Sequence, residues 1–211
     1  RLEVRKRTLN REKAEVMHDI EPYYKWRDMY TAESDEHSPF YKREYSEFHF
    51  PNAVYNYCIH PQWDDIGSPT IYLKLLFVDY EVKFSIIEFI GEWNDCIHND
   101  IMILKREVLD WLMKKGITQF ILVGENILNF HSDGDEYYEE WFQELMDEDG
   151  WIAALNFREH VLQEMRDYNL DLYVNFGGEL DDLSWRTMNP RALYHNVKQI
   201  LSKRLDPRSE V

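Results

Sequence analysis

Acidic and histidine side chains gather in two stretches of this chain, each just after a predicted strand. Glu92 and Asp95 follow one strand, and Glu125 and His131 follow another. Parallel strands end at one edge of a sheet, where α/β proteins bind ligands, so these side chains can converge there. Imidazole and carboxylate groups bind divalent ions, and a spare carboxylate can act as a base. The pattern predicts a candidate metal site for assisted hydrolysis. A chain with 40 acidic residues also produces such clusters by chance.

Ser132 lies in the loop 129–134 (NFHSDG), directly before a predicted helix. Backbone N–H groups and the helix dipole at that position would stabilise a phosphate added to its hydroxyl. The simpler interpretation is a near-capping box, with Ser132 as the N-cap and Asp135 at the third helical position. Asp133, Asp135 and Tyr137 are candidates for a binding surface, although the two aspartates would repel a phosphate.

A third candidate is the loop 60–65 (HPQWDD), which carries His60 and Trp63. It could line a pocket over the sheet edge, where His60 would act as an acid or base. The competing interpretation is a packed loop anchored by Trp63. Cys58 and Cys96 have no C-x-x-C spacing and no adjacent base, so neither is predicted to be a nucleophile.

The composition excludes several classes of partner. The chain has 211 residues, a net charge of −16 and 44% hydrophobic residues, enough to bury a core. An acidic surface repels nucleic acids and anionic membranes. The longest apolar run, 71–78, is interrupted by Lys74 and falls short of the ~20 residues a membrane helix needs. Without a disulfide framework or signal-peptide pattern, we expect a cytoplasmic protein. No cofactor motif is present, so none is predicted.

The fold class follows from alternating strand and helix patterns between residues 70 and 205. The predicted strands are 70–80, 82–93, 119–126, 151–157 and 170–176. The predicted helices are 99–115, with Trp111 on its inner face, 135–146, 159–168 and a last one that has Asn189 as its cap and Pro190 at its first position. The first two strands are close enough in sequence to form a hairpin. We predict an α/β domain with a mostly parallel central sheet and flanking helices, in the order β-β-α-β-α-β-α-β-α.

Residues 1–69 are expected to form an extension of this domain. Residues 1–16 are highly charged and predict a solvated helix or arm, or alternatively a helix that packs on a partner chain. Residues 17–69 are rich in aromatic and turn residues, and we expect them to wrap the main domain. Residues 206–211 are predicted to be a tail.

Three segments resemble the STAS domain, the fold of anti-sigma-factor antagonists and of sulfate-transporter tails. They are 91–95 (GEWND), which resembles the end of the family's second strand, 126–134 (NILNFHSDG), which resembles its phosphoserine loop, and 170–174 (LDLYV), which resembles its edge strand. The resemblance implies that Ser132 occupies the phosphoacceptor position. His131 stands where the family has an aspartate.

Two hypotheses follow. The preferred one is a non-enzymatic regulatory domain that binds a protein partner near Ser132, with self-association through the extension. The alternative is a small metal-assisted hydrolase, or a ligand-binding protein, that uses the acidic and histidine cluster. A small-molecule pocket under the aromatic extension is a further possibility that the sequence leaves open.

Overall fold

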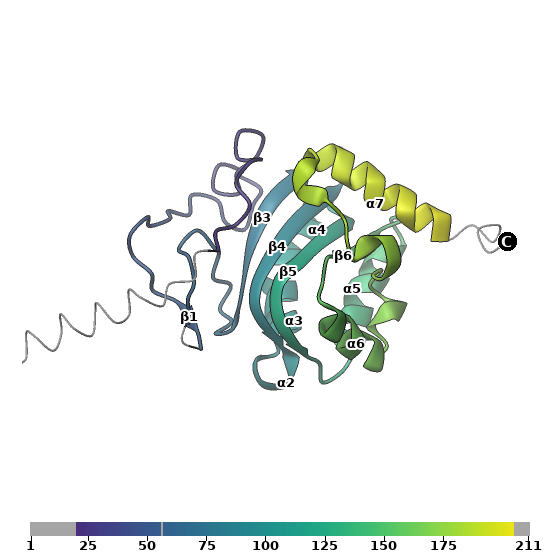
Figure 1. Ribbon diagram of the computed structural model, residues 1–211. Coiled ribbons are helices and arrows are strands. Elements are labelled where there is room, and N and C mark those ends of the chain that lie inside the picture. The colour runs from purple at the N-terminus through teal and green to yellow at the C-terminus, as the bar shows by residue number, and fades with distance from the viewer. Residues whose placement is uncertain (1–19, 56, 205–211) are drawn as a thin grey trace, which may run out of the picture.

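The computed structural model describes residues 20–55 and 57–204, and its centre is one curved sheet with helices on both faces (Figure 1). The strand order is β3-β4-β5-β6. The arm predicted for residues 1–16 and the tail predicted for 206–211 lie outside the described residues. The α/β fold class with a mostly parallel central sheet is confirmed.

The sheet begins with a hairpin, as its short connection predicted. β3 (Ile71–Asp79) pairs antiparallel with β4 (Phe84–Asn94). β5 (Gln119–His131) and β6 (Trp151–Leu155) follow in parallel. Every residue of β4 is buried, because this central strand has neighbours on both sides and is covered on both faces. β5 runs five residues beyond its predicted end at residue 126, so it carries the chain into the Ser132 loop.

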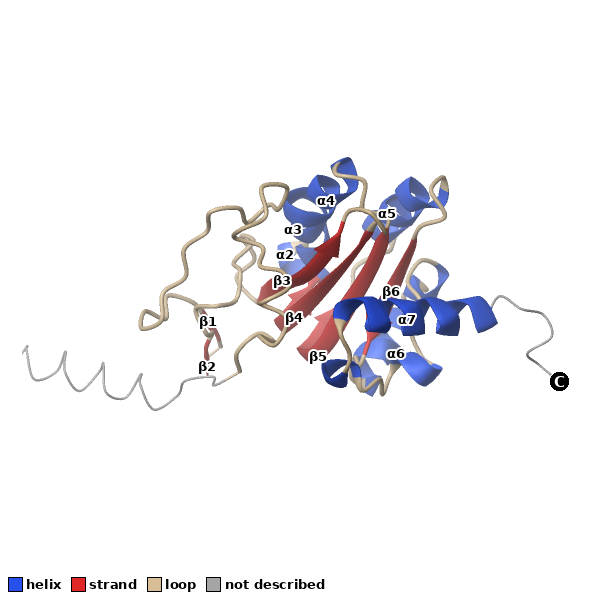
Figure 2. Ribbon diagram, turned by 90° about the horizontal axis from the view of Figure 1, so that it is seen from above, coloured by secondary structure: helices blue, strands red, loops and turns tan. Residues whose placement is uncertain are grey.

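One face of the sheet packs against helices from the middle of the chain (Figure 2). Their bounds are α2 (Asp95–His98), α3 (Asp100–Leu104), a π-helical turn (Lys105–Leu109), α4 (Asp110–Lys114), α5 (Glu136–Met146) and α6 (Glu159–Asp167). α3, the π turn and α4 form the predicted helix 99–115. The π turn changes the helical register, and Trp111, predicted to point inward, is instead 45% exposed.

The opposite face is covered by α7 (Pro190–Arg204) together with part of the extension. The Asn189 side chain accepts a hydrogen bond from the Ala192 N–H at 2.8 Å, which confirms the predicted cap. Tyr23 and Trp26 pack beside α7 in the same apolar cluster. Residues far apart in sequence therefore share this layer of the core.

The predicted fifth strand at 170–176 is wrong. Leu170–Leu172 is a 3-10 turn, and Asn175 makes a single parallel bridge to Ala153 of β6. Asn169 turns the chain with a left-handed φ of 58°, and Leu172 is 65% exposed, so the inward alternation that a strand needs is lost. Two further 3-10 turns, Gly178–Leu180 and Trp185–Thr187, lead to α7.

The described part of the extension lies against the β3 edge of the sheet (Figure 1). It contains a two-stranded hairpin of β1 (Ala53–Val54) and β2 (Tyr57–Cys58). Asp64 exchanges two backbone hydrogen bonds with Leu73 of β3. The buried Asp64 carboxylate also accepts hydrogen bonds from Arg43 at 2.9 Å and from Tyr45 at 2.6 Å. These bonds shield the exposed side of an edge strand.

Candidate functional site

At the carboxyl edge of the sheet, a short helical turn presents an exposed isoleucine. The Asn94 side chain caps α2 by accepting a hydrogen bond from the Ile97 N–H at 3.0 Å. Asn99 ends α2 with a left-handed φ of 54°. Ile97, between these two residues, is 74% exposed. A large apolar side chain is thus held in solvent by a structured turn.

The buried Asp95 carboxylate fixes this turn to the helical layer. It accepts hydrogen bonds from the Trp93 indole N–H at 3.0 Å, the Ile101 N–H at 2.8 Å and the Tyr138 hydroxyl at 2.8 Å. Burial raises the pKa of Asp95 to about 7 against the opposing effect of these donors. Asp95 therefore connects β4, α3 and α5 at one point.

A second buried carboxylate supports the same turn from the other side. Asp100 accepts a hydrogen bond from the Asn94 N–H at 2.8 Å and one from the Thr70 hydroxyl at 3.4 Å. Burial raises the pKa of Asp100 above its usual value. Both aspartates are engaged in holding the backbone, which is a structural use of their charge.

Ser132 is fully buried, and the capping box predicted for it is wrong. Its hydroxyl donates a hydrogen bond to the Gly134 carbonyl at 2.8 Å, and Asp135 is the N-cap residue of α5. Its own carbonyl accepts a hydrogen bond from the Cys96 thiol at 3.1 Å. Because β5 continues to His131, Ser132 still belongs to the packed edge of the sheet. The Ser132 loop and α2 therefore touch.

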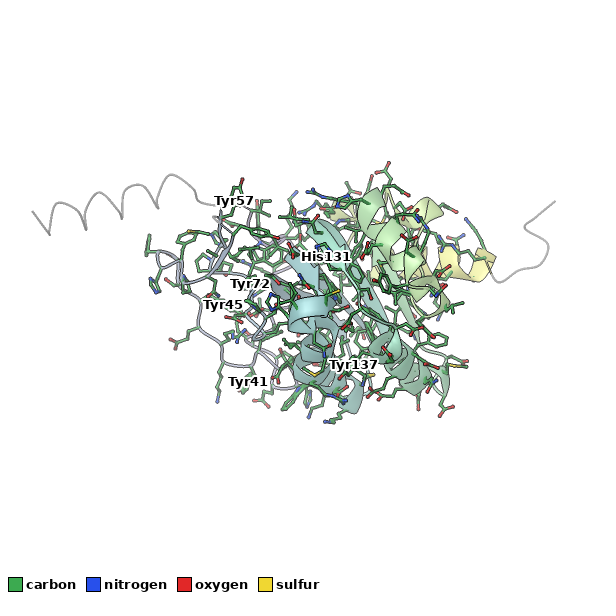
Figure 3. All side chains as sticks on the ribbon, turned by 90° about the horizontal axis from the view of Figure 1, so that it is seen from below. Tyr41, Tyr45, Tyr57, Tyr72, His131 and Tyr137 are labelled. Atoms are coloured by element: carbon green, nitrogen blue, oxygen red, sulfur yellow. The ribbon has the colours of Figure 1, made fainter. Side chains whose placement is uncertain are left out.

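The other predicted binding residues of this loop lie nearer the surface. Asp133 is exposed, and Asp135 accepts a hydrogen bond from the Tyr173 hydroxyl at 3.1 Å. Tyr137 is half-buried on α5 and lies well apart from His131 in Figure 3. Tyr137 stays a predicted binding-surface residue, and its neighbour Tyr138 is the residue whose hydroxyl reaches Asp95.

The four predicted metal ligands do not form one cluster. Glu92 and His131 are neighbours, with 3.8 Å between Oε1 and Nε2. Glu92 also accepts hydrogen bonds from the Asn94 amide and from the Tyr55 hydroxyl. Asp95 faces the helical layer, whereas Glu125 lies with Trp185 on the opposite face. Within the described ranges, no three His, Cys, Asp or Glu side chains are grouped to hold an ion.

Glu125 belongs to a different charge cluster, which is centred on the buried Glu88. The Arg186 guanidinium contacts Glu88 at 3.0 Å and Glu125 at 2.8 Å, and Glu88 also accepts the Tyr23 N–H at 2.7 Å. Burial raises the pKa of Glu88 to about 7 although Arg186 opposes the shift. Burial also acts on Glu125, but hydrogen bonds from Arg186 and other donors hold its pKa below the usual value. The cluster joins the extension, two strands and the segment before α7.

The loop 60–65 is a packed loop, as the simpler interpretation stated. Trp63 is 4% exposed, and its indole N–H donates a hydrogen bond to the Ile20 carbonyl at 2.9 Å. His60 lies 3.5 Å from a Glu21 carboxylate oxygen. Both residues hold the start of the described chain against the extension.

Sequence reasoning missed the two residues that join distant segments, Glu88 and Arg186. Glu88 carried a usable signal, because a lone carboxylate inside the apolar run 84–90 (FSIIEFI) must find a partner once it is buried. Nothing in the sequence distinguishes Arg186 as that partner, since it is 98 residues away.

No protein-family model matches this chain, and no curated protein matches its sequence. Solved structures of SpoIIAA resemble it. The anti-sigma factor antagonist SpoIIAA in its unphosphorylated form has a TM-score of 0.44 and 15% identity, over 60% of this chain and 96% of that one. The Bacillus cell fate determinant SpoIIAA in the phosphorylated form has a TM-score of 0.40 and 14% identity, over 59% of this chain and 98% of that one. No helix in the described part of the chain is long and apolar enough to cross a membrane.

Proposed function

We propose that this chain is a non-enzymatic protein-interaction domain that docks a partner at the carboxyl edge of its sheet. The observation that carries the proposal is Ile97, an isoleucine that is 74% exposed on a capped, hydrogen-bonded turn. Exposed apolar side chains on rigid elements are suited to bind a pocket of a partner, because little conformational entropy is lost on binding. We define the docking surface as α2 with the loop 132–136.

The docking surface is preorganised by hydrogen bonds to two buried carboxylates, Asp95 and Asp100. Asp95 has three donors, and Asp100 is bonded to the Asn94 N–H and the Thr70 hydroxyl. The Cys96 thiol joins α2 to the Ser132 loop. A hydrolytic centre needs groups that are free to meet a substrate, whereas a docking surface needs a fixed shape.

The charge of this surface selects the kind of partner. Asp133, Glu136 and Glu139 are exposed on the loop and the first turns of α5. Acidic groups around an apolar anchor complement a protein surface that surrounds an apolar pocket with lysine or arginine side chains. The proposed partner is therefore a protein with a basic-rimmed apolar pocket.

The test is quantitative capture of protein partners by the purified chain, with Ile97→Asp compared with wild type. Ile97→Asp should weaken binding about tenfold or more, because a buried anchor becomes a charge. Met146→Asp is the matched control, since Met146 is also exposed, at 59%, but lies at the far end of α5. Equal loss in both variants, or no loss in Ile97→Asp, would contradict the docking surface.

Phosphorylation of Ser132 remains our hypothesis for how docking is regulated. The buried hydroxyl can accept a phosphate only after its bond to the Gly134 carbonyl opens. The added charge would then repel Asp133 and separate the loop from α2. Ser132→Asp should therefore weaken partner binding, whereas Ser132→Ala should leave it near the wild-type value. Equal binding by all three proteins would overturn this form of regulation.

A further inference from the structure

A groove of about 440 Å³ opens at the amino edge of the sheet, on the side opposite to the docking surface. It lies where β4 and β5 begin and where the helices α4 and α5 end. Its lining residues are Lys83, Asp110, Met113, Lys114, Gly116, Ile117, Thr118, Glu144, Leu145 and Glu148. The volume is in the range of small-molecule sites, which span about 300–1,000 Å³.

The groove is lined by charges of both signs. Glu144 on α5 and Glu148 just after it line the groove, together with Lys114 at the end of α4 and Lys83 just before β4. A salt bridge of 2.8 Å already joins Lys83 and Glu148. Lys114 has no ion pair among the described side chains. Buried Lys105 engages one oxygen of Asp110 at 2.9 Å and one oxygen of Glu144 at 3.1 Å, which leaves the other Glu144 oxygen for a ligand.

The base of the groove is apolar and contains one unsatisfied polar group. Met113, Ile117 and Leu145 contribute apolar side chains. The Thr118 hydroxyl is buried and has no hydrogen-bond partner within the described chain. Buried hydroxyls in native proteins are nearly always bonded, so an unpaired one beside a groove indicates that a partner is missing.

We propose that this groove binds a small zwitterion with an apolar body, of the class of the apolar α-amino acids. The ligand carboxylate would lie against Lys114, and its ammonium would lie against Glu144 and Glu148. Its side chain would cover Met113 and Leu145. A purely anionic or purely cationic ligand satisfies the charges of one sign and is repelled by those of the other, whereas a zwitterion complements both.

The test is titration of the ¹⁵N-labelled chain with L-phenylalanine, followed through the backbone amides of Gly116 and Thr118. Two derivatives remove one charge each: N-acetyl-L-phenylalanine lacks the ammonium, and L-phenylalaninamide lacks the carboxylate. We expect millimolar binding of L-phenylalanine with shifts confined to the groove, and weaker binding of both derivatives. Equal or tighter binding of either derivative would overturn the zwitterion, and no binding of any of the three would overturn the site.

Substitutions test whether the ligand carboxylate contacts Lys114. Lys114→Gln should weaken L-phenylalanine binding about fivefold but leave L-phenylalaninamide unchanged, because only the carboxylate contact is lost. Lys25→Gln, which removes an exposed lysine outside the groove, is the control and should bind as wild type does. Equal effects of the two substitutions would overturn the assignment of Lys114. This experiment does not involve the docking surface, so its outcome is independent of the proposed function.

Discussion

A buried carboxylate lies on each side of the sheet, Asp95 at its carboxyl edge and Glu88 within β4, but the two are stabilised differently. On the helical face, Asp95 has only uncharged donors. On the α7 face, Glu88 has one backbone N–H and the Arg186 guanidinium. Burial nevertheless raises both pKa values to about 7. The Arg186 guanidinium does not bring the pKa of the completely buried Glu88 back to its usual value. Arg186 also pairs with Glu125, which is the more exposed of the two carboxylates.

The two carboxylates also differ in what they join. Asp95 bonds to residues at most 43 positions away, in β4, α3 and α5, next to the docking surface. The Glu88 cluster reaches 65 residues back to Tyr23 and 98 residues forward to Arg186. One network therefore shapes a local surface, and the other attaches the extension and the last helix to the sheet.

The largest expected effect comes from Asp95→Ala. Three buried donors would lose their acceptor at once, which should lower the free energy of unfolding by about 3 kcal/mol. Chemical denaturation measures this, and Asp133→Ala, an exposed carboxylate on the neighbouring loop, should change it by less than about 0.5 kcal/mol. Similar values for the two variants would contradict the role of Asp95.

Arg186→Met tests the other face. Both Glu88 and Glu125 would lose their cation, and we expect a loss of about 2 kcal/mol, moderated because Glu88 can take up a proton. Arg166→Met is the matched control, since Arg166 makes an exposed pair with Glu159 at 3.1 Å and should cost under about 1 kcal/mol. If Arg166→Met were as destabilising as Arg186→Met, the burial of Glu88 would not make its ion pair with Arg186 more important to stability than an exposed pair.

The pH dependence of the free energy of unfolding tests Asp95 and Glu88 in the same way. Their folded pKa values lie above their unfolded ones, so each contributes stability at low pH that is lost as the pH rises through about 7. Between about pH 6 and about pH 8, each should lower the free energy of unfolding by about 1 kcal/mol. Urea unfolding of Asp95→Asn and Glu88→Gln should show a flatter profile than wild type. A steeper profile in either variant would reverse the sign assigned to that group.

The smallest expected effect is that of Tyr138→Phe. It removes one of the three donors to Asp95 and should cost about 1 kcal/mol, because the carboxylate keeps its other two. Tyr137→Phe should be nearly neutral by thermal or chemical unfolding. A larger cost for Tyr137→Phe would contradict the role of Tyr138 as the donor to Asp95.

Much of the fold was predictable because its signals are local. The hairpin, the helix 99–115 and the Asn189 cap depend on residues within a few positions of each other. The prediction failed at residues 170–176, where a left-handed Asn169 redirected the chain, and at Trp111, where a π turn rotated the helix. The spacing of apolar residues in the sequence does not reveal the left-handed turn or the π turn, since each changes the path of the backbone and leaves that spacing as it is.

The candidate site was predictable only in part. Placing Asp95, Ser132 and His131 at one edge follows from the direction of parallel strands, and the structure does bring Glu92 beside His131. Glu125 was expected at the same cluster, but its side chain points to the other face. Which side a residue takes near the end of a strand depends on bulges, and the register of β4 against β5 shifts twice there.

By itself, the sequence determined the order of the elements from β3 to α6, their approximate bounds and the acidic character of the surface. These depend on periodicity, capping and composition, which neighbouring residues set. Only the tertiary structure decided that Ser132 is buried, that Ile97 is exposed and that Arg186 meets Glu88. Burial and charge pairing depend on residues brought together from distant parts of the chain, because the free energy of a buried carboxylate depends on all the groups around it.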